Sequence, residues 1–552
     1  MKVAIAQNNY HVGNFESNTN KIVLQIKRAK EQGAQLIVFS ELAVCGYPPL
    51  DLLEQQGFIE KAEKAINDIL LHTTGITAIV GAPGINNSEE GKKLYNSAYV
   101  IANGEIRKVI HKSLLPTYDI FDEYRYFEPS EDNEVVEIEG TKVAITICED
   151  LWDEQPIDQP FAQSRLYKHA PMRKLMAHSP EIIINIAASP FSHNQEYKRR
   201  DILRRNASTY NLPLIYVNQV GANTNIIFDG NSKVVNSRGE IVTQLKRFEE
   251  DFQFVETSVI NQMKITDFNL DDTNIRQIHN ALVLGISDYF TKTGFKKALL
   301  GLSGGIDSAV VAALACRALG AENVHGLLMP SEFSSDHSVN DAELLAQRLG
   351  MTYDIVPIKD IYTSTNNALA PVFPENTFDI TEENIQARIR GMLLMAYSNK
   401  YGNMLLNTSN KSEAAVGYST LYGDSNGGLS SIGDLYKKQV YALAEFINSE
   451  KEFIPYNTIN KEPSAELRPD QQDSDSLPPY YVLDSILFEY IERKQSPKEV
   501  ISMGFKRSDV EKIVRLVNIS EHKRYQFPPI LRVSSKSFGE GRRFPIVAKY
   551  DF

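Results

Sequence analysis

The sequence has few cysteines, no long hydrophobic run and no excess of positive charge. Its three cysteines, Cys45, Cys148 and Cys316, are too few and too scattered for a disulfide framework or a thiolate zinc cage. Free thiols are typical of a reducing compartment, and the N-terminus lacks the apolar core of a signal peptide, so we expect a cytoplasmic protein. The longest nearly apolar stretch, AVVAALAC at 309–316, is far shorter than the ~20 residues needed to span a bilayer.

The charge balance and composition are those of an ordinary folded protein. The chain has 58 Lys and Arg residues against 70 Asp and Glu residues, so its net charge is −12. This balance argues against a general nucleic-acid binder, which needs a basic face. Apolar residues make up 42% and charged residues 23%, which excludes a wholly disordered chain. At ~100–200 residues per domain, two or three domains are expected. We expect small-molecule substrates and no nucleic-acid or membrane partner, although a local basic pocket for a phosphorylated substrate is compatible with this balance.

Short apolar runs alternate with helical segments in two stretches of the chain, which predicts an α/β protein. Five of the six runs of the first stretch end in a polar residue, as expected of buried strands with chemistry beyond their carboxyl ends. Residues 240–275 lose this rhythm and are expected to connect two domains, and from residue 297 a second alternation predicts a parallel sheet. Residues 461–479 hold four prolines and many acids, which predicts a loop acting as a lid or binding segment. The runs of the first stretch are 2–7, 34–41, 77–83, 141–149, 181–189 and 212–219.

Cys148 closes an apolar strand and is followed at once by two acids, so its thiol is expected to face a crevice. A free cysteine is more often buried and inert, and this explanation is accepted for Cys316, while Cys45 stays unassigned. Two other segments favour chemistry at Cys148, because Glu41 also ends an apolar strand and Lys112 lies in HKSLLPTY. A thiol that attacks an amide needs a base for its proton and a cation for the thiolate and oxyanion, and these residue types supply both.

These three segments resemble the nitrilase, or carbon–nitrogen hydrolase, superfamily. FSELAVCGYPP, HKSLLPTY and ICEDLW occur in the order and spacing of that family's Glu–Lys–Cys triad. The resemblance implies an N-terminal α-β-β-α sandwich and a thioester intermediate. It implies Glu41 as general base, Lys112 as stabiliser of the thiolate and oxyanion, and Cys148 as nucleophile. Glu123 is a candidate for the family's second carboxylate, and a plain surface acid is the alternative.

A glycine-rich loop, GLSGGIDS, follows a predicted strand and opens a helix. Its glycines let the backbone approach a ligand closely, and a helix N-terminus offers free N–H groups to a phosphate. It is neither a Walker A loop nor a dinucleotide fingerprint, and a plain tight turn is the simpler alternative. SGGIDS resembles the loop of the N-type ATP pyrophosphatases, which implies Asp307 as a magnesium ligand and a cradle for pyrophosphate. The implied cradle residues are Ser303, Gly304, Gly305 and Ser308.

Further segments resemble the glutamine-dependent NAD synthetase family, so that the resemblance covers essentially the whole chain. The matching segments are 383–424, 427–448, 463–480 and 521–545. The resemblance implies a glutaminase domain at 1–260, a linker at 261–275 and a parallel-sheet ATP-pyrophosphatase domain at 276–552. Residues 521–552 hold seven Lys and Arg against three Asp and Glu, and we expect this basic tail to lie over a phosphate-rich nucleotide site rather than merely to aid solubility.

The same resemblance implies contacts in the synthetase half of the chain. Thr408 and Lys437 would contact ATP, although Thr408 is equally well explained as a cap at a strand end, and one of Lys437 and Lys438 is expected to be solvated only. Glu413 would be the second magnesium carboxylate and would lie near the dinucleotide. The residues implied for deamido-NAD are Asn384, Glu413 and Lys536.

The resemblance also implies how glutamine is held. The residues implied for this substrate are Tyr118, Ser189 and Gln195. Many relatives carry a basic residue where this chain has Gln195, which leaves Lys198 or Arg199 as alternatives for the glutamine carboxylate.

The activity implied is ATP-dependent amidation of deamido-NAD to NAD⁺ with ammonia from glutamine. ATP and Mg²⁺ are the implied co-substrate and cofactor, ammonia would pass internally between the sites, and a homo-oligomer is expected. Three alternatives remain: another glutamine-fed synthetase on the same ATP loop, a nucleotide sensor built on an inactive enzyme, and a plain nitrilase or amidase with an accessory domain. The Glu–Lys–Cys triad counts against the first, because synthetases that make GMP or asparagine use other glutaminase types.

Overall fold

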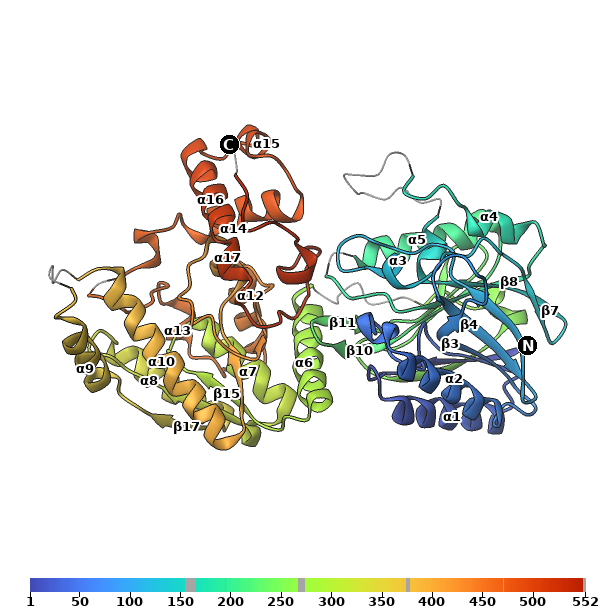
Figure 1. The fold of residues 1–552 in the computed structure, drawn as a ribbon, viewed down its shortest axis with the longest axis horizontal. Coiled ribbons are helices and arrows are strands. Elements are labelled where there is room, and N and C mark those ends of the chain that lie inside the picture. The colour runs from blue at the N-terminus through green and yellow to red at the C-terminus, as the bar shows by residue number, and fades with distance from the viewer. Residues whose placement is uncertain (154–164, 194, 267–273, 374–377, 470, 550–552) are drawn as a thin grey trace. The chain divides into compact units, whose positions relative to one another are not determined.

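The computed structural model describes residues 1–153, 165–193, 195–266, 274–373, 378–469 and 471–549. Within this part, the chain divides into two compact units, Met1–Asp271 and Asp272–Phe552, whose elements are drawn in Figure 1. None of the described helices is both long and apolar enough to cross a membrane.

The first unit contains two six-stranded sheets packed face to face between layers of helices. Helices α1 (Phe15–Glu31) and α2 (Gln56–Leu70) cover one sheet, and α4 (Pro171–Met176) and α5 (Glu196–Tyr210) cover the other (Figure 1). This is the predicted α-β-β-α sandwich. The first sheet has the order β14 (Asp251–Glu256), β1 (Lys2–Gln7), β2 (Leu36–Val38), β3 (Thr77–Ile85), β4 (Leu94–Ala102), β5 (Glu105–His111). The second has the order β13 (Ile241–Gln244), β12 (Lys233–Val235), β9 (Leu214–Asn218), β8 (Ile182–Ala187), β7 (Thr141–Ile147), β6 (Val136–Ile138).

The central strands β1, β7, β8 and β9 are apolar along nearly their whole length because both of their faces are covered. Ile5 of β1 and Ile145, Ile184 and Val217 of the second sheet are at most 1% exposed and belong to one core between the two sheets. Burial of such side chains stabilises each by about 1.5–3 kcal/mol relative to exposure. Parallel pairing of β7, β8 and β9 brings their carboxyl ends to one edge of this sheet.

The expectation that residues 240–275 connect two domains is wrong for their first part. Strands β13 and β14 lie there, and β14 pairs antiparallel with β1 from Lys2↔Glu256 to Gln7↔Asp251. Both are edge strands, where charged residues are common, so their polar composition hides their role. Residues 267–273 of the expected linker lie outside the described residues.

The second unit contains a five-stranded sheet in which every pair is parallel, as predicted. Its order is β17 (Thr352–Ile355), β16 (Val324–Leu328), β15 (Ala298–Gly301), β18 (Met404–Asn407), β19 (Leu429–Ser430). The strand order reverses between β15 and β18. In open α/β sheets a ligand crevice forms at such a point, beyond the carboxyl ends of the strands.

Helices surround this sheet and build a separate cluster toward the C-terminal end. Helices α6 (Asn274–Thr293), α7 (Ile306–Leu319) and α12 (Lys437–Ile447) pack on one another, and α10 (Ile380–Tyr401) contacts β15 and β18. The C-terminal cluster shares one apolar core, to which α11 (Lys411–Val416), α14 (Tyr480–Leu487), α15 (Pro497–Ser502) and α16 (Arg507–Ile519) contribute. The remaining described α-helices are α3 (Glu123–Tyr126), α8 (Asp336–Leu349), α9 (Lys359–Leu369), α13 (Tyr456–Asn460) and α17 (Glu521–Arg524).

Helix α11 is bonded at both of its ends to this later part of the chain. The buried Lys411 ammonium donates hydrogen bonds to Ser534 Oγ and to the carbonyl of Lys536, each at 2.8 Å, and pairs with Glu492. At the other end, Arg524 donates to the carbonyl oxygen of Ala415 at 2.6 Å. The short helix is therefore held in place by residues that lie 81 to 125 positions later in the sequence.

Candidate active sites

Glu41, Lys112 and Glu123 meet in the interior of the first unit. Lys112 follows β5 and is fully buried, and its Nζ lies 2.7 Å from Glu41 Oε1 and 2.7 Å from Glu123 Oε2. Asn96 Nδ2 also donates to Glu41 Oε1 at 2.7 Å, and the backbone N–H of Ala188 donates to Glu41 Oε2 at 2.9 Å. Glu41 is thus oriented through both of its oxygens.

The charges of this cluster set the protonation of its members. Burial lowers the pKa of Lys112, but Glu123 and Glu41 outweigh burial and hold that pKa well above its ordinary value. Burial, opposed by Lys112, raises the pKa of Glu123 to about 7. Tyr47 donates its hydroxyl to Glu123 at 2.9 Å. Glu123 is therefore a member of the buried cluster, and the alternative of a plain surface acid is wrong.

Cys148 lies immediately beyond β7 and begins the short 3₁₀ turn Cys148–Trp152. Its φ of 44° is in the left-handed region, which costs a non-glycine residue energy and is found often at active sites. Its Sγ lies 3.6 Å from Ser189 Oγ, beyond the end of the neighbouring strand β8. Burial and Glu41 raise the pKa of the Cys148 thiol well above its ordinary value, while Lys112 lowers it. The thiol is therefore protonated at neutral pH until a base removes its proton.

Asp150 fastens this turn to the segment that follows Lys112. Its Oδ2 accepts a hydrogen bond from the N–H of Ile147 at 3.0 Å. Its Oδ1 accepts from the N–H groups of Ser113 at 3.0 Å and Leu114 at 2.9 Å. One carboxylate thus connects the backbone next to the thiol with the backbone next to the buried lysine.

Glu149 is a site residue that the sequence interpretation did not assign. It is 3% exposed, and its Oε1 accepts the hydroxyls of Tyr118 at 2.8 Å and Tyr167 at 2.9 Å. Burial raises the pKa of Glu149, and the two tyrosines oppose that rise. Tyr118, which was expected to bind glutamine, is therefore placed next to the nucleophile through an acid that adjoins Cys148.

The structure separates the candidates for a glutamine carboxylate contact. Gln195 precedes α5 and is partly buried. Arg199 is 7% exposed and donates to both oxygens of Asp229, at 2.9 and 2.6 Å, while Lys198 is exposed. Because its guanidinium is already paired with a buried carboxylate, Arg199 is the weaker of the two alternatives to Gln195.

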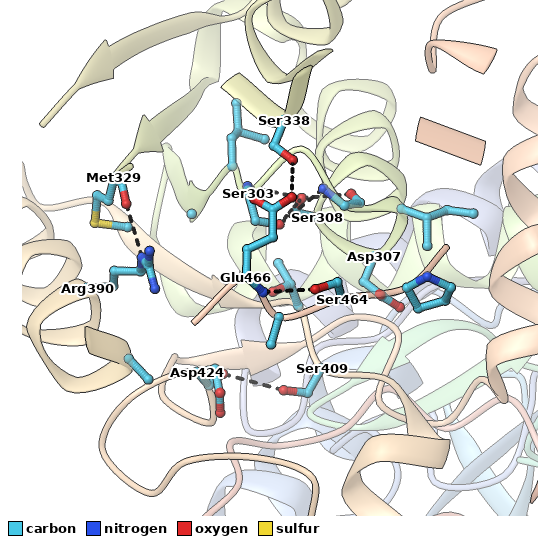
Figure 2. Close-up of a pocket in the computed structure, with 18 of the residues that line it drawn as sticks. Ser303, Asp307, Ser308, Met329, Ser338, Arg390, Ser409, Asp424, Ser464 and Glu466 are labelled. Atoms are coloured by element: carbon cyan, nitrogen blue, oxygen red, sulfur yellow. Dashed lines mark hydrogen bonds between the residues drawn. The ribbon is translucent and has the colours of Figure 1, made fainter. Parts of the chain in front are cut away.

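The second unit has a cavity of about 300 Å³ at the carboxyl ends of β15 and β18. Figure 2 shows Ser303 and Ser308 of the glycine-rich loop on its wall, with Ser464 and Glu466 of the 461–479 segment close to them. Its wall contains seven residues that the resemblance implied for ATP or magnesium: Ser303, Gly305, Asp307, Ser308, Thr408, Glu413 and Lys437. The glycine-rich loop and the end of strand β18 therefore meet at one site.

Three of the implied residues do not line this cavity. Gly304 has φ +77°, and a Cβ there would lie 2.2 Å from the carbonyl oxygen of Ser338, so glycine is required for packing. Asn384 accepts the hydroxyl of Thr420 at 2.7 Å, and the backbone carbonyl of Lys536 accepts from Lys411. The proposed dinucleotide contacts of Asn384 and Lys536 consequently stay predictions.

Asp307 and Glu413 present carboxylates to each other across Lys437. Lys437 Nζ lies 2.5 Å from Asp307 Oδ2 and 3.5 Å from Glu413 Oε1. Burial and Asp307 raise the pKa of Glu413 to about 8, and Lys437 opposes that rise. Burial lowers the pKa of Lys437, but Asp307 and Glu413 outweigh burial and hold it above its ordinary value. Two carboxylates that share one cation position are a donor set that fits Mg²⁺, whose ligands are oxygens.

Two different protein families match the two units of the chain. The carbon-nitrogen hydrolase family model matches residues 2–157, and the NAD synthase model matches residues 278–527. The glutamine-dependent NAD(+) synthetase of Synechocystis sp. is 46% identical to this chain over 99% of both proteins. The chain belongs to the glutamine-dependent NAD(+) synthetase family.

Other members of the glutamine-dependent NAD(+) synthetase family agree over the same length. The Acinetobacter baylyi member is 42% identical over 99% of this chain and 98% of its own. The structure of the Acinetobacter baumannii member in complex with ADP is 38% identical, with a TM-score of 0.77, and covers 99% of this chain and 98% of that one. Members of the NAD synthase family use ATP.

Proposed function

We propose that this chain is an enzyme that amidates deamido-NAD to NAD⁺, with ATP and with ammonia taken from glutamine. The observation that carries the proposal is the presence of two features in one chain. The first is the buried Glu41–Lys112 pair beside the strained Cys148. The second is the cavity of the second unit that the glycine-rich loop lines. A plain amidase does not need the second feature. An ammonia-dependent synthetase does not need the first.

In the first unit, Cys148 attacks the side-chain amide carbon of glutamine. Glu41 accepts the thiol proton, because its charge acts on the Cys148 thiol and Lys112, Asn96 and the Ala188 N–H hold its carboxylate in place. Lys112 stabilises the tetrahedral oxyanion, and Glu123 on its other side keeps the ammonium charged and fixed. Glu41 returns the proton to the amide nitrogen, ammonia leaves, a glutamyl thioester remains on Cys148, and water hydrolyses it to glutamate.

Glutamine is recognised through the residues around the thiol. Glu149 offers a carboxylate to the α-ammonium group, and Tyr118 and Tyr167 orient that carboxylate. Ser189 lies beside the thiol. Gln195, or Lys198 in its place, is proposed to contact the α-carboxylate.

In the second unit, the nicotinate carboxylate of deamido-NAD attacks the α-phosphate of ATP and pyrophosphate leaves. Ser303, Gly305 and Ser308 are proposed to bind the pyrophosphate at the N-terminus of α7, where free N–H groups favour an anion. Mg²⁺, proposed to be held by Asp307 and Glu413, would neutralise the charge that grows on the leaving group. Ammonia then attacks the acyl adenylate and displaces AMP, which gives NAD⁺.

Several finer features belong to this proposal. We propose glutaminase function for residues 1–260 and synthetase function for 276–552, with Thr408 and Lys437 on ATP and Asn384, Glu413 and Lys536 on the dinucleotide. Internal passage of ammonia is proposed because free ammonia in neutral water is mostly ammonium, which is not nucleophilic. A homo-oligomer in the cytoplasm, with no nucleic-acid or membrane partner, completes the proposal.

The test compares the wild type with Cys148→Ala by mass spectrometry of the dinucleotide. Each protein receives deamido-NAD, ATP and magnesium with either amide-¹⁵N-glutamine or ammonium chloride. The wild type should make labelled NAD⁺ from glutamine, and the variant should make NAD⁺ only from ammonium. Absence of NAD⁺ from the wild type with both nitrogen sources would contradict the synthetase function, and turnover of glutamine without ATP consumption would favour a plain amidase.

A further inference from the structure

The proposed magnesium ligands already hold a cation in this structure, and that cation is a side chain. Lys437 opens α12 and its side chain is 4% exposed, with its ammonium between Asp307 of α7 and Glu413 of α11. A carboxyl oxygen at 2.5 Å and another at 3.5 Å give this ammonium the position that a metal ion shared by the two acids would take. The lysine and a divalent ion therefore compete for one place.

The chain by itself offers a metal few further ligands at this position. Across the described ranges, no group of three or more His, Cys, Asp or Glu side chains is arranged to hold a metal ion. Asn410 turns its amide N–H₂ toward Asp307 at 2.9 Å, as a donor. Asp473, on the same cavity wall, accepts the hydroxyls of Tyr418 at 3.1 Å and Tyr480 at 2.7 Å.

Mg²⁺ prefers six oxygens in octahedral geometry and is usually held by one or two carboxylates together with substrate phosphates. Two carboxylates that already pair with a buried ammonium attract the ion too weakly to offset the free energy lost when it gives up its bound water. A bound triphosphate favours both the metal ion that enters and the ammonium that it displaces. Its oxygens complete the coordination of the metal and also accept hydrogen bonds from the displaced ammonium.

We propose that Lys437 is the resident counter-ion of Asp307 and Glu413, which excludes divalent metal from the free protein and yields its place only to a nucleotide–metal complex. The inference rests on the proposed function, because it takes these two acids as metal ligands. Binding is then ordered by charge. Metal without nucleotide meets an occupied site, and nucleotide without metal brings no cation to take the place of the ammonium.

The test uses Mn²⁺, which carboxylates and water also suit, as a paramagnetic probe of the full-length protein. The amplitude of the electron paramagnetic resonance signal of free Mn²⁺ gives the bound fraction, with and without a non-hydrolysable ATP analogue, and the Mn²⁺ that the same concentration of analogue binds without protein is subtracted. The wild type should bind Mn²⁺ weakly alone and about tenfold or more tightly with the analogue. Lys437→Met should bind Mn²⁺ without nucleotide about tenfold or more tightly than the wild type, because no ammonium opposes the metal.

The neighbouring lysine gives the matched control. Lys438 is exposed, so Lys438→Met should behave as the wild type does. Lys437→Met/Asp307→Asn should lose the gain in affinity, which assigns the bound ion to this pair of acids. Circular dichroism establishes that each variant is folded, and the wild-type comparison with and without nucleotide needs no variant.

Two results would overturn the inference. Equal affinity of the wild type for Mn²⁺ with and without nucleotide would show that Lys437 does not exclude the ion. Unchanged affinity in folded Lys437→Met would show the same. Failure of the proposed function is distinguishable, because it would appear as absent NAD⁺ formation by the wild type rather than in the metal titration.

Discussion

Replacing Lys112 by methionine tests the buried charge cluster of the first unit most directly. Methionine keeps most of the side-chain length and removes the ammonium. Glu41 and Glu123, 1% and 5% exposed, then face each other without the cation that now lies 2.7 Å from each. We expect loss of stability of the first unit and loss of glutamine hydrolysis, while NAD⁺ synthesis from ammonium continues wherever the second unit is folded.

The magnitude follows from the burial of all three groups. Removing one partner of a buried ion pair usually costs about 3–5 kcal/mol, which in a unit of this size lowers the Tm by roughly 10 °C. Loss of an oxyanion-stabilising donor lowers kcat by a factor on the order of 10²–10³. Lys112→Met/Glu123→Gln removes one of the two opposed carboxylates and should recover part of the stability but none of the glutaminase rate.

Differential scanning calorimetry and glutamate release are the two measurements. Lys108→Met is the matched control, because Lys108 lies on β5, the strand that Lys112 follows, has a side chain that is 41% exposed and pairs with Glu134 at the surface. It should match the wild type in both assays. If Lys112→Met unfolded at the same temperature as Lys108→Met and hydrolysed glutamine at the wild-type rate, the proposed roles of the buried Lys112 ammonium in stability and in catalysis would be refuted.

Three further predictions concern carboxylates of the first unit. Glu149→Gln should raise the KM for glutamine about tenfold or more without changing the rate with ammonium, because a charge-assisted contact is lost; steady-state kinetics with both nitrogen sources checks this. Asp150→Asn places an N–H₂ group against backbone donors, so the variant should lose about 1–3 kcal/mol of stability and much of its glutaminase rate, measured by urea unfolding and glutamate release. Glu123 has a pKa raised from 4.5 to about 7, so the folded state holds a proton that the unfolded state has released, and this group makes the unit less stable as pH rises from about 4.5 to about 7. Glu123→Gln should remove that fall from urea-unfolding free energies measured across this pH range, and an unchanged slope would contradict the assignment.

The sequence predicts those strands that are apolar on both faces and misses those that are not. KVAIAQ and TKVAITICE are continuous apolar runs, and β1 and β7 lie within them. By contrast β5, with the sequence EIRKVIH, is at the edge of its sheet and largely exposed over its first residues, so no apolar run marks it. Edge strands are set by pairing with a neighbour rather than by their own composition.

The candidate sites divide in a similar way. Glu41, Cys148 and the glycine-rich loop are found because each follows a buried strand, where site residues gather. Glu149 was not assigned because its role depends on two hydroxyls that reach it from positions 31 and 18 residues away in the sequence. Likewise, no pattern in KKQ separates Lys437 from Lys438; only the packing of α12 buries the first and leaves the second in water.

The attachment of α11 has a consequence for the order in which the protein matures during synthesis. The helix that carries Glu413 is bonded through Lys411 to Ser534 and Lys536, 123 and 125 residues later in the chain. The strands of the first unit, in contrast, are complete once β14 has paired with β1. On the ribosome, the unit proposed to release ammonia can therefore assemble while the unit proposed to consume it still lacks the residues that anchor Glu413. A nascent or C-terminally shortened chain is then expected to hydrolyse glutamine without making a dinucleotide.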